Sequence, residues 1–279
     1  MSTAPKYELK GNLRMRDEPD PEVEARPQKI PKTVMVTGAN RGIGLGLVQH
    51  FLEYDGIELL IATCRNPEKA DELNKLKDDK RLHIIALDVD DDDSIKKVFD
   101  EVSSLVSSNG LNVLINNAGI LLPYEVDGPM ICRKTMLKQL ETNSVSVAIV
   151  TQTFLPLLKI ASSLEEGEEV RIDRAAIINI SSTMASIAKN DGCFSGPMTA
   201  YRMSKSALNS FSRQSFMELS KYHILVTSFC PGWVRTDMGG ENADLDVNES
   251  TRTLSANILR LDSRNNGLYF DRFLHPIPN

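Results

Sequence analysis

Cysteine is scarce in this chain of 279 residues, and the few cysteines are widely scattered. None belongs to a C-x-x-C pair, and none stands beside histidines at zinc-binding spacing. The sequence therefore predicts reduced thiols rather than a disulfide framework, and it predicts no metal site. The four cysteines are Cys64, Cys132, Cys193 and Cys230.

Long apolar runs and an excess of positive charge are also missing. No run approaches the roughly 18 apolar residues of a membrane span, and the N-terminus lacks the charged-then-apolar layout of a secretory signal. The net charge of -6 and the pI near 5.4 give no overall attraction to nucleic acid or to anionic membranes. We therefore expect a cytoplasmic protein with no nucleic-acid partner and no membrane partner.

Residues 1–31 differ from the rest because Pro, Glu, Asp, Lys and Arg dominate them. Their few apolar residues cannot bury much surface, so we expect a disordered N-terminal extension. Its many acids disfavour a mitochondrial transit peptide, which would be poor in acids. The chain is 41% hydrophobic overall, so residues 32–279 can bury one sizeable core, which predicts a single domain.

Apolar runs of strand length alternate with amphipathic helical stripes along residues 32–279. Such alternation requires parallel strands joined by right-handed crossovers, with helices on both faces. The sequence therefore predicts an α/β fold, a doubly wound parallel sheet of Rossmann type, which binds ligands at the carboxyl ends of its strands. The expected strands are 34–36, 59–62, 82–87, 111–115, 175–180 and 224–229, and the main expected helices are 43–52, 95–106, 132–160 and 200–220.

A glycine-rich segment, 37–44, follows the first expected strand and opens the first expected helix. Its spacing is Gly38-x3-Gly42-x-Gly44. Glycines so placed allow a tight turn, let the backbone approach a pyrophosphate, and let free N–H groups at the helix N-terminus face negative charge. Alone, such a segment can be an ordinary turn; in this position it predicts a dinucleotide site.

Polar residues and glycines follow four later strands at the point where each strand ends. Each group alone is typical of a turn or a cap. Because the carboxyl ends of parallel strands meet at one edge of a sheet, the groups together predict a cleft for a cofactor and a substrate. They are Asp88-Val89, Asn116-Asn117-Ala118-Gly119, Ser181-Ser182 and Pro231-Gly232.

Tyr201 is the only one of six tyrosines that has a lysine, Lys205, four residues later. On a helix this spacing puts both side chains on one face. A phenol titrates near pH 10, and a nearby cation lowers its pKa, so the pair suggests proton transfer. An incidental pair on a surface helix is the alternative.

These motifs together resemble the short-chain dehydrogenase/reductase family over nearly all of residues 32–279. Within it, the runs 62–67, 200–209 and 231–240 look like the sniffer-type NADPH-dependent carbonyl reductases. The resemblance implies that Tyr201 gives a proton to a carbonyl oxygen while a nicotinamide hydride reaches carbon.

The resemblance also implies roles for the neighbours of Tyr201. Lys205 would lower the pKa of Tyr201 and hold the ribose hydroxyls, Ser182 rather than Ser181 would polarise the oxygen, and Asn143 would hold a proton-relay water. The gap between Ser182 and Tyr201 is longer than is common in the family, so we expect 189–198 to form a loop over the cleft mouth. The implied cofactor-binding residues are Gly38, Asn40, Arg41, Gly42, Ile43, Gly44, Arg65, Asp88, Val89, Asn117, Ala118, Gly119, Tyr201, Lys205, Pro231, Gly232, Val234 and Thr236.

Charge favours NADP(H) over NAD(H). An NAD enzyme needs an acid about 20 residues after the glycines for the ribose 2′-hydroxyl, whereas an NADP enzyme needs cations for the 2′-phosphate. Position 65 is arginine, and Arg41 inside the glycine loop supplies a second guanidinium. We therefore expect NADP(H) as the cofactor.

The substrate is less determined than the reaction. An aldehyde, ketone or quinone suits an apolar cleft, and an oxoacyl thioester reductase and a non-catalytic NADP-binding interaction protein are the alternatives. Related enzymes often pair through the two long helices, here near 132–160 and 200–220, so a homodimer of that kind is one expectation. The apolar residues expected near the cleft are Ile120, Leu121, Leu122, Met184, Phe194, Trp233 and Met238.

Overall fold

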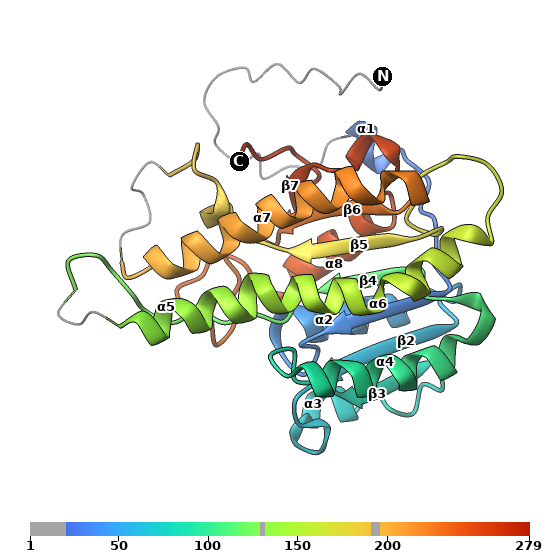
Figure 1. The fold of residues 1–279 in the computed structure, drawn as a ribbon, viewed down its shortest axis with the longest axis horizontal. Coiled ribbons are helices and arrows are strands. Elements are labelled where there is room, and N and C mark those ends of the chain that lie inside the picture. The colour runs from blue at the N-terminus through green and yellow to red at the C-terminus, as the bar shows by residue number, and fades with distance from the viewer. Residues whose placement is uncertain (1–20, 129–131, 191–195) are drawn as a thin grey trace.

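One sheet of seven parallel strands forms the centre of the computed structural model, which describes residues 21–128, 132–190 and 196–279 (Figure 1). The strand order is β3-β2-β1-β4-β5-β6-β7, so the chain winds outward from β1 in one direction and then from β4 in the other. This order confirms the predicted doubly wound fold. The strands are β1 Thr33–Thr37, β2 Leu59–Cys64, β3 Leu82–Ala86, β4 Val113–Asn116, β5 Ala176–Ile180, β6 Leu225–Cys230 and β7 Tyr269–Asp271.

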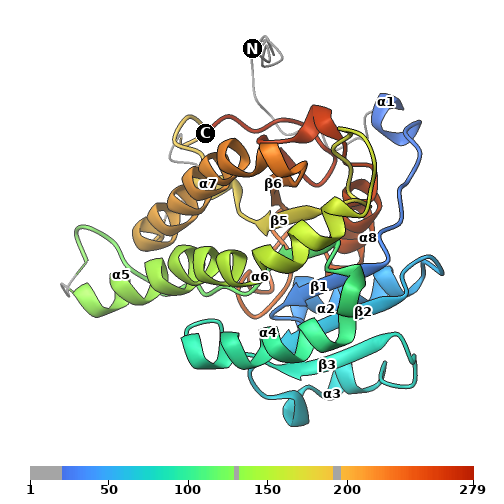
Figure 2. The same ribbon diagram turned by 45° about the vertical axis from the view of Figure 1, so that its right-hand side comes forward.

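Helices cover both faces of the sheet, and this is why its central strands are apolar and buried on both sides (Figure 2). On one face Phe51 and Ile258 belong to the same core as the strands; on the other, Val98 and Phe154 do. The first face carries α2 Gly42–Leu52 and α8 Val247–Ile258; the second carries α4 Asp92–Val106, α5 Arg133–Leu140, α6 Ser146–Ser163 and α7 Thr199–Leu219. Two short helices are α1 Pro21–Glu24 and α3 Asp71–Asn74.

Helix α8 and strand β7 are two elements that the periodicity did not indicate. Helix α8 packs on α2 through small polar side chains rather than an apolar stripe: Ser250, Thr251 and Ser255 are buried. A Cβ added to Gly46 of α2 would lie 2.5 Å from the hydroxyl oxygen of Thr251, so the two helices approach closely. Strand β7 has only three residues, too few for a recognisable pattern.

Residues 21–31 do not form the disordered extension that composition suggested. Val23 is buried in the core, and the backbone N–H of Lys29 donates to the carbonyl of Leu259 at 2.7 Å. The side chain of Gln28 donates to Tyr54 and to the carbonyl of Ala256. Few apolar residues suffice here because they pack on a surface that the rest of the fold provides. The remainder of the predicted extension, 1–20, lies outside the described residues.

The long helix 133–163 reaches the length and mean apolarity of a membrane span, although it contains no uninterrupted apolar run of that length. By length and composition alone it qualifies, with a mean hydropathy of 1.5 over its most apolar stretch, 44% of which is buried. Val150, Phe154 and Leu158 lie in the core between α4 and the sheet. Packing against the sheet therefore accounts for its apolar character.

The cysteines of the described residues are free thiols: Cys64 and Cys230 are buried and Cys132 is partly exposed. The fourth, Cys193, lies outside the described residues. Burial raises the pKa of the Cys64 thiol, which keeps that group in its neutral form.

Candidate active site

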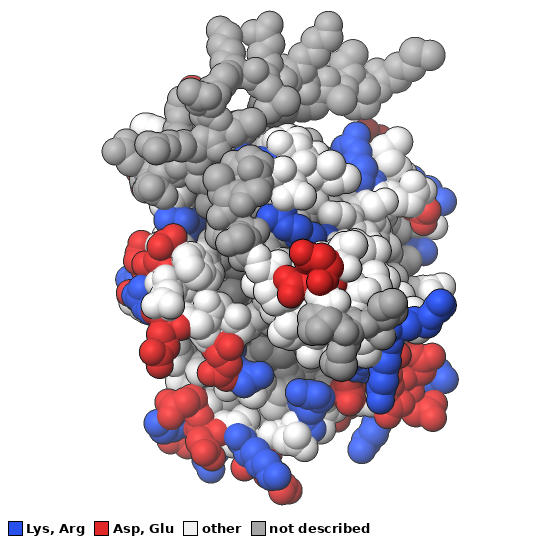
Figure 3. Space-filling model, turned by 90° about the vertical axis from the view of Figure 1, so that its left-hand side faces the viewer, with Lys and Arg blue, Asp and Glu red and all other residues white. Residues whose placement is uncertain are grey.

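The strands all end at one side of the molecule, the left-hand side in Figure 1, and the predicted site residues lie there. Figure 3 looks onto this side, where charged groups of both signs lie scattered among uncharged ones in the part that the structure describes. The glycine turn, the strand ends and the start of α7 therefore meet, as the parallel topology requires.

The glycine turn has a backbone that other residues would strain or block. Gly38 and Gly42 have φ of +65° and +54°, and a Cβ on Gly44 would lie 2.3 Å from the carbonyl oxygen of Gly38. The side-chain amide of Asn117 donates to the carbonyls of Thr37, at 2.8 Å, and Gly38, at 3.0 Å. Arg41 stands at the N-cap of α2 without a side-chain cap, so the first N–H groups of α2 are available to an anion. These features fit the pyrophosphate of a dinucleotide.

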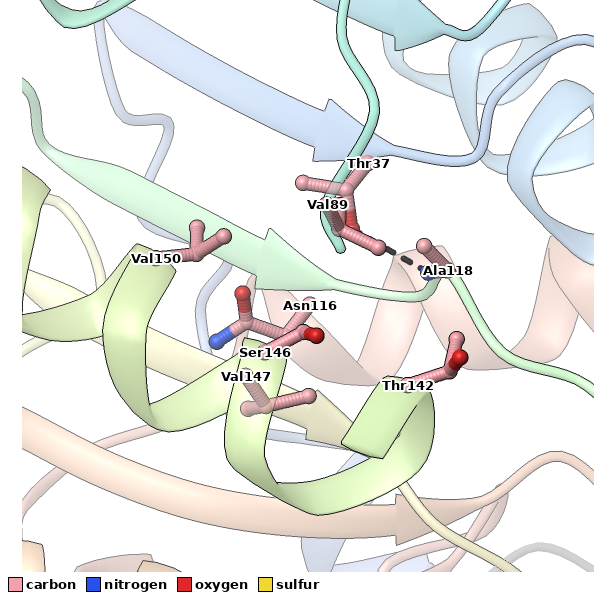
Figure 4. Close-up of a pocket in the computed structure, with 8 residues that line it drawn as sticks. All are labelled: Thr37, Val89, Asn116, Ala118, Thr142, Ser146, Val147 and Val150. Carbon is pink, nitrogen blue, oxygen red and sulfur yellow. Dashed lines mark hydrogen bonds between the residues drawn. The ribbon is translucent and has the colours of Figure 1, made fainter. Parts of the chain in front are cut away.

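A small pocket lies between the ends of β1 and β4 and the helix that carries Asn143 (Figure 4). The N–H of Ala118 donates to the hydroxyl of Thr37 at 3.1 Å, which joins the two strand ends. Val89 closes the pocket from the loop after β3, and the carboxylate of Asp88 shapes that loop by accepting from the N–H of Asp90. Asp88 and Val89 therefore lie at the same edge of the sheet as the glycine turn, where cofactor-binding residues are expected.

Tyr201 and Lys205 come from the first turns of α7 and are both buried, with 7% and 5% of their surface exposed. The ammonium of Lys205 donates to the carbonyl of Ile180 at 2.8 Å and lies 5.9 Å from the centre of the Tyr201 ring. Ser182 follows β5 and lies close enough to the Tyr201 hydroxyl to lower its pKa, whereas the hydroxyl of Ser181 donates to Asn209 at 2.7 Å. The geometry thus brings Ser182, Tyr201 and Lys205 together.

The net shift of the Tyr201 pKa is upward, opposite to the lowering that the resemblance implies for Lys205. Burial raises the pKa of Tyr201 to about 12, and the hydrogen bond with Ser182 only partly opposes that rise. Burial likewise lowers the pKa of Lys205 to about 8. Both shifts have the same cause, since a buried side chain loses the water that stabilises its charged form. Tyr201 is therefore a neutral phenol near pH 7 and has a proton to donate.

Asn143 lies within a π-helical turn, Glu141–Val145, that joins α5 to α6. Its side-chain oxygen accepts from the N–H of Ile120 at 2.8 Å, and its amide donates to the carbonyl of Ile120 at 2.8 Å and to Ser204 at 2.9 Å. Asn143 is fully buried. It connects the loop after β4 to α7, because Ser204 is the residue of α7 directly before Lys205.

The segment after β6 lies against the glycine turn. A Cβ on Gly42 would lie 3.1 Å from the side chain of Thr236, and Val234, two residues before Thr236, is buried. Pro231 is buried, and Gly232 has a φ of +92°. Thus the predicted positions after β6 approach the predicted turn after β1.

Sequence reasoning missed an acid in this region. The guanidinium of Arg41 pairs with the carboxylate of Asp237, and both side chains are mostly exposed. Arg65 is exposed just beyond the end of β2. No local signal connects Asp237 to Arg41, because 196 positions separate them.

The apolar residues expected near the cleft are partly exposed on this side. Trp233 and Met238 expose 42% and 44% of their surface, and 120–122 and Met184 are intermediate. The predicted loop 189–198 is described only in part, and Phe194 lies outside the described residues. The described C-terminal part of this loop is hydrogen-bonded to the rest of the protein, since the N–H of Tyr124 donates to the carbonyl of Pro197 at 2.7 Å.

Comparison with known proteins agrees with this arrangement. The family model described as short chain dehydrogenase matches residues 32–246. The carbonyl reductase Sniffer of Drosophila melanogaster is 37% identical, with a TM-score of 0.85 over 89% of this chain and all of that one. An NADPH-bound carbonyl reductase from chicken fatty liver is 35% identical, with a TM-score of 0.89 over 95% of this chain and all of that one.

A curated relative, estradiol 17-beta-dehydrogenase 2 of Rattus norvegicus, is 30% identical over 219 residues, which are 78% of this chain. The chain spans about half of that longer protein, 52% of its length. The family model covers more than half of the chain, and its region contains the glycine turn, Ser182 and Tyr201. The chain therefore belongs to the short-chain dehydrogenase family.

Proposed function

We propose that this protein is an NADPH-dependent reductase that converts the carbonyl of an aldehyde, ketone or quinone to an alcohol. One observation carries the proposal: Tyr201 is buried at the carboxyl end of the sheet beside Ser182 and Lys205, where burial keeps its phenol protonated near pH 7. The similarity to two carbonyl reductases supports the same reaction class.

Particular residues would hold the cofactor. The N-terminus of α2, after Gly38 and Gly42, would face the pyrophosphate, and the loop at Val89 would lie near the adenine. Lys205 would hold the ribose hydroxyls. NADPH, when bound, supplies the hydride.

The remaining step belongs to the chain itself. Tyr201 would donate its phenolic proton to the carbonyl oxygen, and Ser182 would donate a hydrogen bond to the same oxygen. Lys205 keeps its charge below a pH of about 8, and a cation near Tyr201 favours the phenolate that remains after the proton leaves. The pair is thus suited to give a proton and then to stabilise the product anion.

Charge supports NADPH rather than NADH. Arg41 and Arg65 offer two guanidinium groups beyond the ends of the neighbouring strands β1 and β2, and forked donors suit a phosphate. Asp237 pairs with Arg41 and would compete with the 2′-phosphate for its guanidinium, so this ion pair would have to break when NADPH binds.

The test is a panel of aldehydes, ketones, quinones, hydroxysteroids and oxoacyl thioesters, followed by NADPH absorbance with Tyr201→Phe beside the wild type. The variant keeps the ring and loses only the proton, so NADPH should still bind while carbonyl reduction falls by about 10²- to 10⁴-fold. Near wild-type rates in Tyr201→Phe would contradict the mechanism. Turnover of thioesters alone would favour an oxoacyl reductase, and tight NADPH binding without any turnover would favour a binding protein.

A further inference from the structure

Asp90 is an acid that the proposed reaction does not use, yet side chains of the α5–α6 helix beside the site bind its carboxylate. It accepts three hydrogen bonds, from the ammonium of Lys138 at 2.7 Å, the hydroxyl of Thr142 at 2.7 Å and the hydroxyl of Ser146 at 2.6 Å. Its side chain is 16% exposed. The three donors follow each other at intervals of four, so one face of the α5–α6 helix converges on a single carboxylate.

The neighbouring acids do not share this environment. Asp91 caps α4 by accepting from the N–H of Asp93, Asp92 is exposed, and the side chain of Asp93 is 93% exposed. Burial alone would raise the pKa of Asp90, but the bonds from Lys138, Ser146 and Thr142 outweigh that effect and lower it. Asp90 is therefore held as a carboxylate.

The donors to Asp90 bracket the π-helical turn Glu141–Val145. Lys138 precedes the turn, Thr142 lies within it, and Ser146 follows it directly. A π turn departs from regular α-helical hydrogen bonding and is frequently found at functional sites. Here the hydroxyls of Thr142 and Ser146 donate to Asp90 in the loop after β3. These two bonds fix the turn relative to that loop.

Asn143 and Ser144 of the turn contact the elements that carry the proposed catalytic residues. Asn143 bonds both backbone groups of Ile120, and the hydroxyl of Ser144 donates to the carbonyl of Ser204 at 2.7 Å. Ser204 in turn donates to the carbonyl of Tyr201 at 2.8 Å. Hydrogen bonds on either side of the turn, joined through its backbone at 142–144, thus link the loop after β3 to the start of α7.

We propose that Asp90 is a positioning residue, whose carboxylate fixes the turn that carries Asn143 and thereby sets the loop at Ile120 and the placement of Tyr201 and Lys205. Val89, beside Asp90, lines the same pocket as Thr142 and Ser146 (Figure 4), so the carboxylate also ties the expected adenine side to the catalytic side. The catalytic part of this proposal rests on the proposed function.

The test compares Asp90→Asn with Asp92→Asn, which makes the same chemical change at an exposed position two residues away. Hydrogen exchange should accelerate about tenfold or more in segments 118–122 and 141–146 of Asp90→Asn, because opening of the turn releases the Ile120 amide. In the same variant kcat should fall about 10- to 100-fold, the effect of small misplacement of reacting groups, and the deuterium isotope effect with NADPH labelled at the transferred hydride should rise. Asp92→Asn should behave as the wild type in each measurement.

Thr142→Val and Ser146→Ala remove one donor each and serve if Asp90→Asn does not fold. Each should accelerate exchange at Ile120 and lower kcat in the same direction, more weakly. Acceleration confined to 88–93, or an unchanged kcat and isotope effect, would overturn the proposal, since a merely structural acid would lower stability alone. If the wild type reduces no carbonyl, the proposed function fails, and exchange at Ile120 still decides whether Asp90 positions the turn.

Discussion

Replacing Lys205 by methionine should change how the stability of the protein depends on pH. Lys205 is buried with its ammonium on the carbonyl of Ile180, and burial lowers its pKa from 10.5 to about 8. At about 1.4 kcal/mol for each factor of ten, that difference corresponds to a destabilisation of about 3 kcal/mol while the lysine is charged. Methionine has a similar length and no charge, so the variant lacks this destabilisation.

The sign follows from proton binding. Between pH 8 and 10.5 the unfolded chain holds a proton that the folded chain has lost, so the free energy of unfolding of the wild type rises with pH. The destabilisation is fully present well below pH 8, and it falls from about 3 kcal/mol at pH 7 to about 2 kcal/mol at pH 9. Tyr201 contributes little in this range, because its unfolded pKa is near 10 and its folded pKa about 12.

The assay is urea unfolding of wild type and Lys205→Met at pH 7, 8 and 9. The difference in free energy of unfolding, wild type minus variant, should rise by about 1 kcal/mol from pH 7 to pH 9. The lost hydrogen bond to Ile180 shifts every value equally and does not affect this slope. Lys96→Met, at a side chain that is 72% exposed, is the control and should show no slope. A constant difference for Lys205→Met would refute the argument that burial destabilises its charge.

Three further outcomes follow from the structure. Arg65→Ala should weaken NADPH by at least about tenfold and NADH little, because charged contacts to phosphate contribute about 1.5 to 3 kcal/mol each; equal losses in titrations of both cofactors would contradict the assignment. Asp237→Asn should tighten NADPH by up to about fivefold and leave NADH unchanged, since an exposed ion pair with Arg41 is worth at most about 1 kcal/mol; unchanged NADPH affinity would show that the pair does not compete. Deleting 1–31 should lower the melting temperature, because Val23 alone buries a side chain worth about 2 kcal/mol; an unchanged melt would show that the segment adds nothing.

The fold could be predicted because each central strand is an apolar run that a parallel sheet buries on both faces. The runs at β2, β5 and β6 are short, buried throughout or nearly so, and followed by turn residues, which makes them readable without tertiary information. Helix α8 was missed because buried serines and threonines replace its apolar stripe. Val23 and Ile30 were missed because an isolated apolar residue gives no sign of the surface it will meet.

The positions of the candidate site could also be predicted, since the topology itself gathers the ends of the strands. Tyr201 and Lys205 share a helix face because they are four residues apart, and Ser182 follows the end of a strand. Both features can be recognised locally, and the fold brings them together. Their electrostatics could not be predicted in the same way. The pKa of Tyr201 depends on how completely the surrounding residues exclude water, and a lysine four positions away does not reveal this.

The same limit applies to the acids that act at a distance in the sequence. Asp90 and Asp92 belong to one run of four aspartates, and by sequence they are equivalent. The fold separates them, because Lys138, 48 positions further along, reaches Asp90 and leaves Asp92 in solvent. Asp237 is an exposed acid that pairs with Arg41. Whether a carboxylate holds a turn, competes with a phosphate or does neither is therefore decided by the packing around it, and substitutions at Asp90, Asp92 and Asp237 separate the three cases.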